Sequence, residues 1–259
     1  LSNADSVRRL FREVRPSVVF HLAGYVQGSR DLDQVSPALT GNLTTAVNVL
    51  TSVAETGCER LVMAGSHDEP DPGEACATAF VPPSPYAAAK FAGSAYARMF
   101  HALYGCPVTI VRVFMGYGPG QRDLKKLIPY VILSLLRGHS PRLGTGWRPL
   151  DRVYVDDIVE GILRASSSAS LAGSTIPLGT GVAFTVREAV EKIAEMMQSR
   201  AALSFGEIPD RPLEKARVAD VAVTRAMLGW HPRVTFDAGL RRTIAWYRAQ
   251  VQSGAIQAG

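Results

Sequence analysis

The chain has 259 residues, of which 47% are hydrophobic and 20% are charged, and its formal net charge is +5. This composition is typical of a globular chain with one large or two modest domains, and it excludes disordered, collagen-like and coiled-coil proteins. The basic residues are scattered rather than gathered in a run, which argues against nucleic-acid binding.

Short apolar runs alternate with helical periodicity over the first 120 residues. Ser2 and Asp5 stand in capping-box spacing at the start of the first helix, and Gly57 ends the second. In chain order we expect a helix over 2–14, a strand over 17–23, a helix over 42–56, a strand over 60–65, a helix opened by Ser84-Pro85 and a strand over 107–114. This alternation predicts an α/β fold with a parallel sheet and right-handed crossovers.

Beyond residue 120 the alternation loosens and helical patterns dominate. The expected helices run from Leu124 to Leu135 before Gly138, begin at Asp156-Asp157, begin at the Thr185–Glu188 capping box, and surround residues 240–251. We expect these later elements to form a smaller lobe, wrapped onto the sheet, over residues 121–259.

The strongest chemical signal is the segment SPYAAAK at residues 84–90. Tyr86 and Lys90 are four residues apart, so a helix places both on one face with the ammonium near the phenol. A free phenol has a pKa of about 10, and a neighbouring positive charge favours the phenolate that proton transfer requires. This spacing alone equally describes a surface helix pair. Ser66 favours the catalytic interpretation over a surface helix pair. It ends the preceding strand, and ligands of parallel sheets bind beyond the carboxyl ends of strands.

These motifs and others in order along the chain resemble the extended short-chain dehydrogenase/reductase family, in its nucleotide-sugar epimerase/dehydratase branch. The resemblance covers essentially the whole chain, and its order and spacing are specific. Besides Ser66 and residues 84–90, it rests on VVFHLAG at 18–24, NLTTAVNVL at 42–50, RVFMGYGPGQ at 112–121, VYVDD at 153–157, Arg211-Pro212 and LGWHP at 228–232.

The resemblance implies a Rossmann-like, doubly wound parallel sheet with a smaller C-terminal α+β substrate lobe. Residues 1–120 would form a partial NAD(P)-binding Rossmann domain to which a segment of about 150–180 returns. Residues 121–259 would be mainly the substrate-binding lobe.

The resemblance also implies a role for each site residue. Tyr86 would be the catalytic acid-base, Lys90 would lower its pKa and hold the nicotinamide ribose, and Ser66 would bind the sugar oxygen that is oxidised. The residues implied at the cofactor, NAD or NADP, are Leu22, Ala23, Gly24, Asn42, Tyr86, Lys90 and Phe114. Those implied at the substrate are Ser66, Met115, Arg152 and Arg211, where the arginines would grip its diphosphate or, alternatively, form surface ion pairs. No metal is implied.

The chain departs from the family pattern at several points. Met115 stands where many relatives have asparagine, and Leu150 stands where they have arginine. The GxxGxxG cofactor loop, which seats phosphates at a helix N-terminus, is absent from the sequence. The first residue is Leu1 rather than Met, and we expect two missing βα units, about 60 residues. This chain alone would then bind NAD weakly or not at all and be inactive.

A further departure concerns elimination chemistry. Dehydratases of this branch carry a Thr-Asp-Glu triplet, but in the segment SHDE the carboxyls fall one residue late. We therefore expect Asp68 and Glu69 to lie at a solvated loop edge and His67 to be a loop residue rather than a base.

The leading hypothesis is an NAD(P)-dependent enzyme that transiently oxidises a ring hydroxyl of a nucleotide-diphosphate sugar and completes an epimerisation. The alternatives are a nucleotide-sugar 4,6-dehydratase or 4-ketoreductase and, in another class, a non-catalytic Rossmann-fold binding protein. The sugar, the nucleotide and the choice between NAD and NADP stay open.

We expect a homodimer through the helices near 42–56 and 86–103, as in many relatives, and neither a nucleic-acid nor a membrane partner. No apolar stretch approaches the roughly 18 residues of a membrane helix, and no signal peptide opens the chain. Cys58, Cys76 and Cys106 lack CxxC spacing, which indicates neither a disulfide framework nor a zinc site and favours a reducing, cytoplasmic setting.

Overall fold

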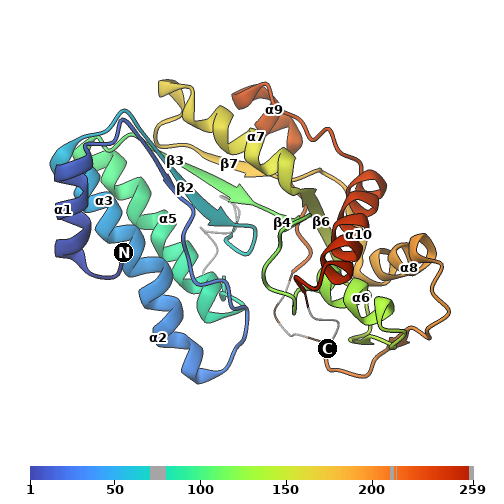
Figure 1. Cartoon of the computed structure of the whole chain (residues 1–259). Coiled ribbons are helices and arrows are strands. Elements are labelled where there is room, and N and C mark those ends of the chain that lie inside the picture. Colours follow the sequence, from blue (N-terminus) through green and yellow to red (C-terminus); the bar gives the residue numbers. More distant parts are fainter. Residues whose placement is uncertain (71–79, 211–212, 214, 257–259) are drawn as a thin grey trace.

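A parallel four-stranded sheet forms the centre of the protein, whose computed structural model describes residues 1–70, 80–210, 213 and 215–256. Its strands lie in the order β1 (Val18–His21), β2 (Arg60–Ser66), β3 (Val108–Val113) and β7 (Thr175–Leu178). The predicted α/β class with a parallel sheet is confirmed, and β7 adds a strand that the sequence pattern did not resolve. The strands point toward the C-terminal lobe (Figure 1).

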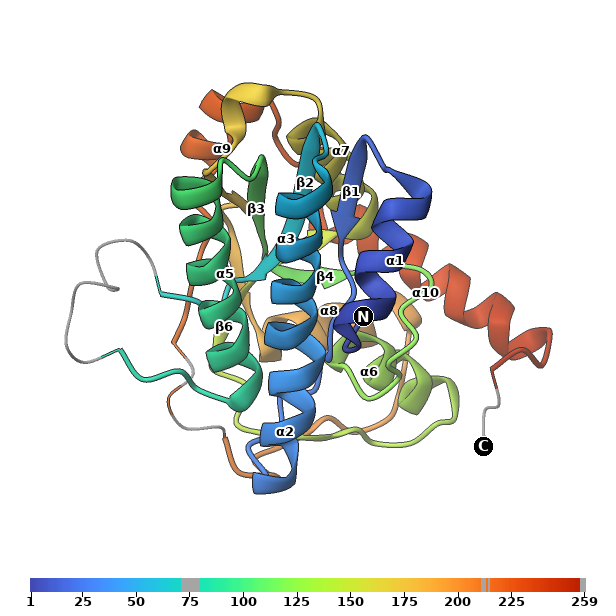
Figure 2. The ribbon, with the colours of Figure 1, turned by 90° about the vertical axis from the view of Figure 1, so that its left-hand side faces the viewer.

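Helices cover both faces of this sheet because strand side chains alternate between the faces. On one face lie α1 (Ala4–Val14), α3 (Thr45–Thr56) and α5 (Pro85–Tyr104) (Figure 2). On the other lie α7 (Val155–Ser166) and α9 (Val221–Leu228) (Figure 1). Leu61 and Met63 belong to the core beneath α1, α3 and α5, whereas Val62 between them belongs to the core beneath α7. Because the strands are parallel, the carboxyl ends of β1, β2 and β3 lie at one edge of the sheet.

Helix ends follow the capping residues. Ser84 accepts a hydrogen bond from the Ala87 N–H (3.2 Å) and Pro85 follows it, which confirms the predicted start of α5. Gly57, with φ of 78°, ends α3 as predicted. The capping box predicted at Ser2 is wrong, because the side chain of Asn3 is the one that reaches a free amide of the first turn (2.8 Å).

The helix predicted over 42–56 has a longer, irregular start. It begins with the 3₁₀ turn η1 (Leu32–Gln34) and continues through α2 (Val35–Ala38) and the π-helical turn η2 (Leu39–Thr44) into α3. Asn42 lies within η2. Single π-helical turns are often found at functional sites.

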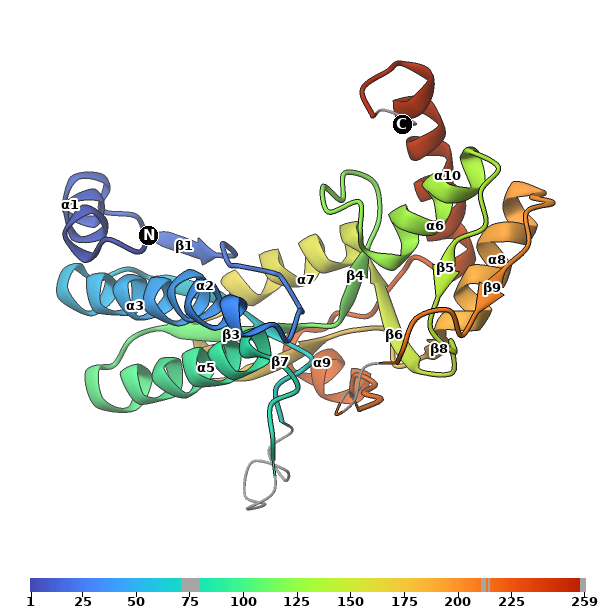
Figure 3. The same cartoon turned by 90° about the horizontal axis from the view of Figure 1, so that it is seen from below.

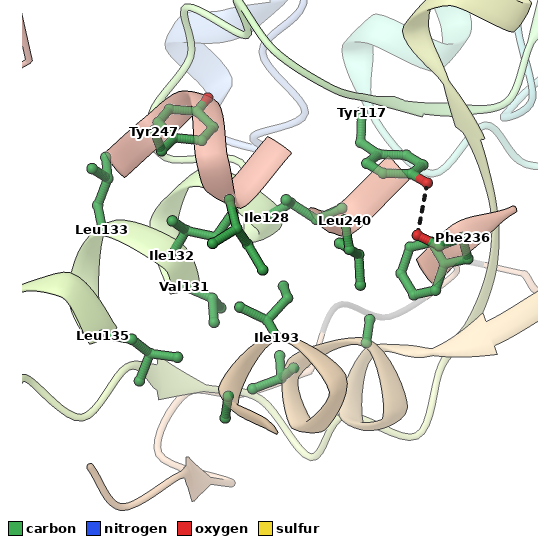
Figure 4. Packing of buried hydrophobic residues seen from close by; sticks show 14 of the residues in the cluster. Tyr117, Ile128, Val131, Ile132, Leu133, Leu135, Ile193, Phe236, Leu240 and Tyr247 are labelled. Atoms are coloured by element: carbon green, nitrogen blue, oxygen red, sulfur yellow. Dashed lines mark hydrogen bonds between the residues drawn. The ribbon is translucent and has the colours of Figure 1, made fainter. Parts of the chain in front are cut away.

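The C-terminal lobe has its own hydrophobic core between α6 (Leu127–Leu136), α8 (Val186–Met197) and α10 (Phe236–Gln252) (Figure 4). Ile132, Ile193 and Leu240 meet there and are fully buried. The predicted capping box of α8 is confirmed, since Thr185 and Glu188 each accept from the other's backbone N–H.

Short strands connect the lobe to the main sheet (Figure 3). One small sheet has the strand order β4 (Met115–Tyr117), β6 (Pro149–Tyr154) and β8 (Ala183–Thr185). A second small sheet pairs β5 (Arg142–Leu143) with β9 (Ser204–Phe205). The 3₁₀ turn η3 spans Ala169–Leu171. Because β4 begins one residue after Phe114, the lobe starts directly beyond the end of β3. Within the described ranges, every helix is too short or too polar to span a membrane.

Candidate active site

The ends of β2 and α5 bring the three residues predicted for catalysis together. Ser66 is the last residue of β2 and is buried. Tyr86 and Lys90 lie in the first two turns of α5, one turn apart, so both face the sheet edge where β2 ends. The Ser66 side chain lies close enough to the Tyr86 phenol to lower the pKa of that phenol.

The surroundings of Tyr86 keep its phenol protonated. The pKa of Tyr86 is raised to about 12, with burial as the largest cause; the Ser66 side chain lowers this pKa, and the carboxylates of Asp68 and Glu69 add to the rise. At neutral pH the phenol is therefore a hydrogen-bond donor to a substrate oxygen. A role as base requires additional positive charge beside it.

Lys90 lies in position to supply such a charge to a ligand. Its ammonium donates to the carbonyl oxygen of Ala64 (2.9 Å), and an ammonium carries three protons. Burial lowers the pKa of Lys90, and the carboxylate of Glu69 raises it. The groups that shift the pKa of Tyr86 are Ser66, Asp68 and Glu69, so a direct effect of Lys90 on the phenol stays a prediction.

The loop after β1 forms a cradle beside Lys90. Asn42 holds this loop: its amide donates to the Tyr25 carbonyl (2.9 Å) and accepts from the Tyr25 N–H (3.1 Å). A Cβ atom on Gly24 would lie 2.7 Å from Asn42 Oδ1 and 3.5 Å from Lys90 Nζ. Only glycine leaves this space open, and a ligand can approach the backbone there.

This cradle fits the nicotinamide end of a dinucleotide. Leu22, Ala23 and Gly24 are exposed at the carboxyl end of β1. Lys90 keeps donors for ribose hydroxyls on the opposite wall. The structure thus brings together Gly24 from the loop after β1, Asn42 from η2 and Lys90 from α5, and their contact with a cofactor stays a prediction.

Phe114 and Met115 lie where β3 passes into β4. Phe114 is buried, and its ring lies 5.9 Å from the ring of His67, measured between centroids. Met115 is half-buried and pairs in register with Arg152 on β6. Phe114 therefore lies next to the turn that follows Ser66.

The two arginines predicted at the diphosphate are placed differently. Arg152 is buried in the lobe, where it donates to the carbonyl of Phe184 (2.7 Å) and lies over the ring of Phe236 (5.9 Å to the centroid). Burial lowers its pKa to about 10. Arg211 lies outside the described residues. The substrate contacts of both stay predictions.

The solvated edge predicted for Glu69 is wrong. Glu69 is fully buried, because the chain turns back after β2 and its carboxylate accepts the Ser66 N–H (2.7 Å). Asp68 remains partly exposed. His67 lies in the same turn, and burial lowers its pKa. In the sequence, nothing about the polar segment HDE indicates that the carboxyl of Glu69 is buried and that of Asp68 is not.

Comparisons with known proteins agree with this arrangement. The model of the NAD dependent epimerase/dehydratase family matches residues 1–179. The chain is 30% identical to UDP-glucose 4-epimerase of Mycolicibacterium smegmatis over 251 residues, which is 94% of this chain and 80% of that protein.

Solved structures show the same fold. The structure of Thermus thermophilus UDP-glucose 4-epimerase with NAD superposes with a TM-score of 0.82 at 28% identity, over 95% of this chain and 82% of that one. DesIV, a dTDP-glucose 4,6-dehydratase of Streptomyces venezuelae with NAD and TYD bound, superposes with a TM-score of 0.85 at 28% identity, over 97% of this chain and 79% of that one. These likenesses confirm the Rossmann-like fold expected from the motifs.

Proposed function

The chain belongs to the NAD-dependent epimerase/dehydratase family, and from this premise we propose that it oxidises a ring hydroxyl of a nucleotide-diphosphate sugar transiently to a ketone. The observation that carries the proposal is the meeting of Ser66 and Tyr86 at the end of β2, with Lys90 one turn further along α5. NAD, when bound, supplies the acceptor and donor of the hydride.

The chain's own residues bind the sugar and move its proton. The Ser66 hydroxyl orients the reacting sugar oxygen, and the Tyr86 phenol oxygen takes or returns its proton. Lys90 would hold the ribose of the cofactor beside Gly24 and Asn42. Its ammonium, together with the cofactor's charge, would offset the effect of burial on Tyr86.

Removing the phenol oxygen tests this assignment. We expect Tyr86→Phe to lower turnover of UDP- and dTDP-hexoses roughly 10²–10⁴-fold, the range of general acid–base catalysis, without loss of fold. Tyr104→Phe, on the exposed end of the same helix, is the matched control and should keep full turnover. The two readouts are circular dichroism for the fold and product analysis by NMR, which distinguishes epimers of equal mass. Equal turnover of Tyr86→Phe and wild type would refute the assignment and favour a non-catalytic binding protein.

Epimerisation is the outcome that we propose, with 4,6-dehydration or 4-ketoreduction as the alternatives. Elimination needs free carboxyl groups beside the sugar, and Glu69 is fully buried under the Ser66 turn. Asp68 is the remaining carboxyl of this turn that solvent reaches. The similarity to a dTDP-glucose 4,6-dehydratase keeps elimination as the second candidate, and loss of water in the product would identify it.

The family's cofactor is NAD, and similar structures hold UDP-glucose, or TYD together with NAD. We assign the cofactor to the loop after β1 and the sugar nucleotide mainly to the lobe over residues 121–259. Both cysteines within the described ranges, Cys58 and Cys106, are free thiols, which supports a reducing compartment such as the cytoplasm.

A homodimer is also part of the proposal. An apolar groove of about 630 Å³ runs between the α2–η2 segment and the start of α5. Val35 and Leu39 line it, and both side chains are nearly half exposed. Apolar surface of this kind on two neighbouring helices supports packing against a second copy.

A further inference from the structure

Glu69 is a buried carboxyl directly beneath the candidate active site. Its exposed fraction is 0%, and its Oε1 accepts the backbone N–H of Ser66 (2.7 Å). The carboxyl lies against Gly65, where a Cβ atom would come within 2.8 Å of Oε1. The glycine therefore makes room for the carboxyl under the residue that carries the serine hydroxyl.

Groups from two other elements face this carboxyl. The hydroxyl of Ser94 on α5 lies near the carboxyl and lowers its pKa, although neither Glu69 Oε2 nor Ser94 Oγ has a hydrogen-bond partner in the described part of the chain. Arg112 on β3 and Lys90 on α5 contribute positive charge. The pKa of Glu69 is raised above its ordinary value, because burial outweighs the lowering effects of Ser94, the Ser66 N–H and these two cations. A buried carboxylate is tolerated where hydrogen bonds and cations surround it.

The charge of Glu69 acts on both partners of the catalytic pair. Its carboxylate raises the pKa of Lys90 and the pKa of Tyr86. Two further titratable groups face the pair: Asp68, in the same turn, raises the pKa of Tyr86, and His21, on β1, lies near Lys90. Among these groups Glu69 alone combines burial with a hydrogen bond to the Ser66 backbone.

We propose that Glu69 is a positioning residue of this site, whose carboxylate holds the turn that carries Ser66 and sets the charge balance between Lys90 and Tyr86. The inference rests on the proposed function for its kinetic consequences. The electrostatic consequences of the proposal can be measured without turnover. Because its carboxyl is fully buried, Glu69 would act through Ser66, Lys90 and Tyr86 rather than on a ligand directly.

Two substitutions separate the two roles. Glu69→Gln keeps the shape and the acceptor for the Ser66 N–H but removes the charge, whereas Glu69→Val removes both. Glu195→Gln, an exposed carboxylate on α8, is the matched control for loss of one negative charge. The chain has few lysines, at positions 90, 125, 126, 192 and 215, so the Lys90 side chain can be assigned in heteronuclear NMR spectra with a Lys90→Arg reference.

We expect the Lys90 titration midpoint to fall by on the order of one pH unit in Glu69→Gln, because a nearby negative charge is removed at low dielectric. The same variant should shift the acid limb of kcat/KM to lower pH, since the pKa of Tyr86 falls as well. Glu69→Val should show the same shifts and a kcat roughly tenfold below that of Glu69→Gln, because the Ser66 N–H loses its partner. Glu195→Gln should change none of these.

A Lys90 midpoint in Glu69→Gln that equals that of wild type would overturn the charge role. Equal kcat in Glu69→Gln and Glu69→Val, both folded by circular dichroism, would overturn the positioning role. The NMR titration requires no substrate, so it decides the first point even if the chain shows no turnover. A failure of the proposed function would instead appear as activity that survives Tyr86→Phe.

Discussion

Neutral histidine and charged lysine lie side by side beneath the cofactor cradle. His21, the last residue of β1, is 6% exposed. Its burial and the ammonium of Lys90 lower its pKa to about 4. The imidazole is therefore uncharged at neutral pH, and Lys90 is the cation of this pair.

The low pKa of His21 predicts a loss of stability in acid. Unfolded histidine has a pKa of about 6.5, so between pH 6.5 and 4 the unfolded chain binds a proton that the folded chain does not. The stabilisation is present above pH 6.5 and is lost as pH falls toward 4, by about 3 kcal/mol in total. Urea unfolding at pH 7.5 and pH 5 should show about 2 kcal/mol of this loss in wild type and a smaller loss in His21→Gln. His139→Gln, at an exposed site, should leave the loss unchanged; an identical loss in His21→Gln would contradict the explanation.

At this scale, sequence predicts residues whose position follows from local geometry. The face shared by Tyr86 and Lys90 follows from helical spacing, and the place of Ser66 follows from the end of a parallel strand. The burial of Glu69 and Arg152 depends on which segments pack over them, and this is a property of the tertiary structure. The wrong expectation for Glu69 has this cause.

Elements were predictable where a capping residue marks their ends. Ser84 and the Thr185–Glu188 pair fix α5 and α8 through side-chain hydrogen bonds to the first turn. The region before α3 was not predictable, because η1, α2 and η2 are each one or two turns long. The strands of the lobe, as short as two residues in β5, carry too little alternation to be recognised.

Two glycines inside helices should respond in opposite ways to alanine. In an open helix this substitution stabilises by about 1 kcal/mol. A Cβ at Gly93, in α5, would meet Ala46 Cβ at an ordinary 3.8 Å, so Gly93→Ala should gain about 0.5–1 kcal/mol. A Cβ at Gly239, in α10, would lie 2.1 Å from Tyr117 Oη, which is held by its bond to the Phe236 carbonyl (3.2 Å).

Overpacking at Gly239 therefore outweighs helix propensity. The free energy of unfolding of Gly239→Ala should be roughly 1–3 kcal/mol lower than that of wild type, although alanine is a better helix former than glycine. Urea unfolding of the two variants at pH 7.5 measures both effects. If Gly239→Ala were as stable as Gly93→Ala, α10 would be able to move away from Tyr117 without a loss of unfolding free energy, and the overpacking argument would be wrong.

At the scale of the whole molecule, buried carboxylates join the C-terminal lobe to the main sheet and its helices. Asp151 on β6 accepts N–H bonds from Thr180, Gly181 and Ala219, which ties the lobe to the segments that flank α8 and α9. Asp157 on α7 accepts from Val234 at the start of α10 (3.0 Å). Sequence predicted a change of organisation near residue 120. It could not predict these ties, because each joins residues at least 29 positions apart.

Association is a property of the whole molecule and is tested there. If the α2–η2 groove packs against a second copy, light scattering should give twice the chain mass of 27.9 kDa for wild type. Leu39→Arg places a charge on this surface and should give 27.9 kDa. Leu163→Arg, equally exposed on α7, should leave the mass of wild type unchanged. A wild type that is monomeric at all concentrations would rule out the homodimer.

The contact between Gly65 and Glu69 also constrains how this sequence can diverge. With the glutamate present, any side chain at position 65 meets its carboxyl oxygen. A smaller residue at position 69 removes that obstacle, although Ile110 Cγ2 at 3.1 Å still limits the added group to a small one. Replacement at 69 must therefore precede replacement at 65 along any path through folded intermediates. The reverse order passes through a destabilised protein, so the two positions should change in a fixed order during evolution.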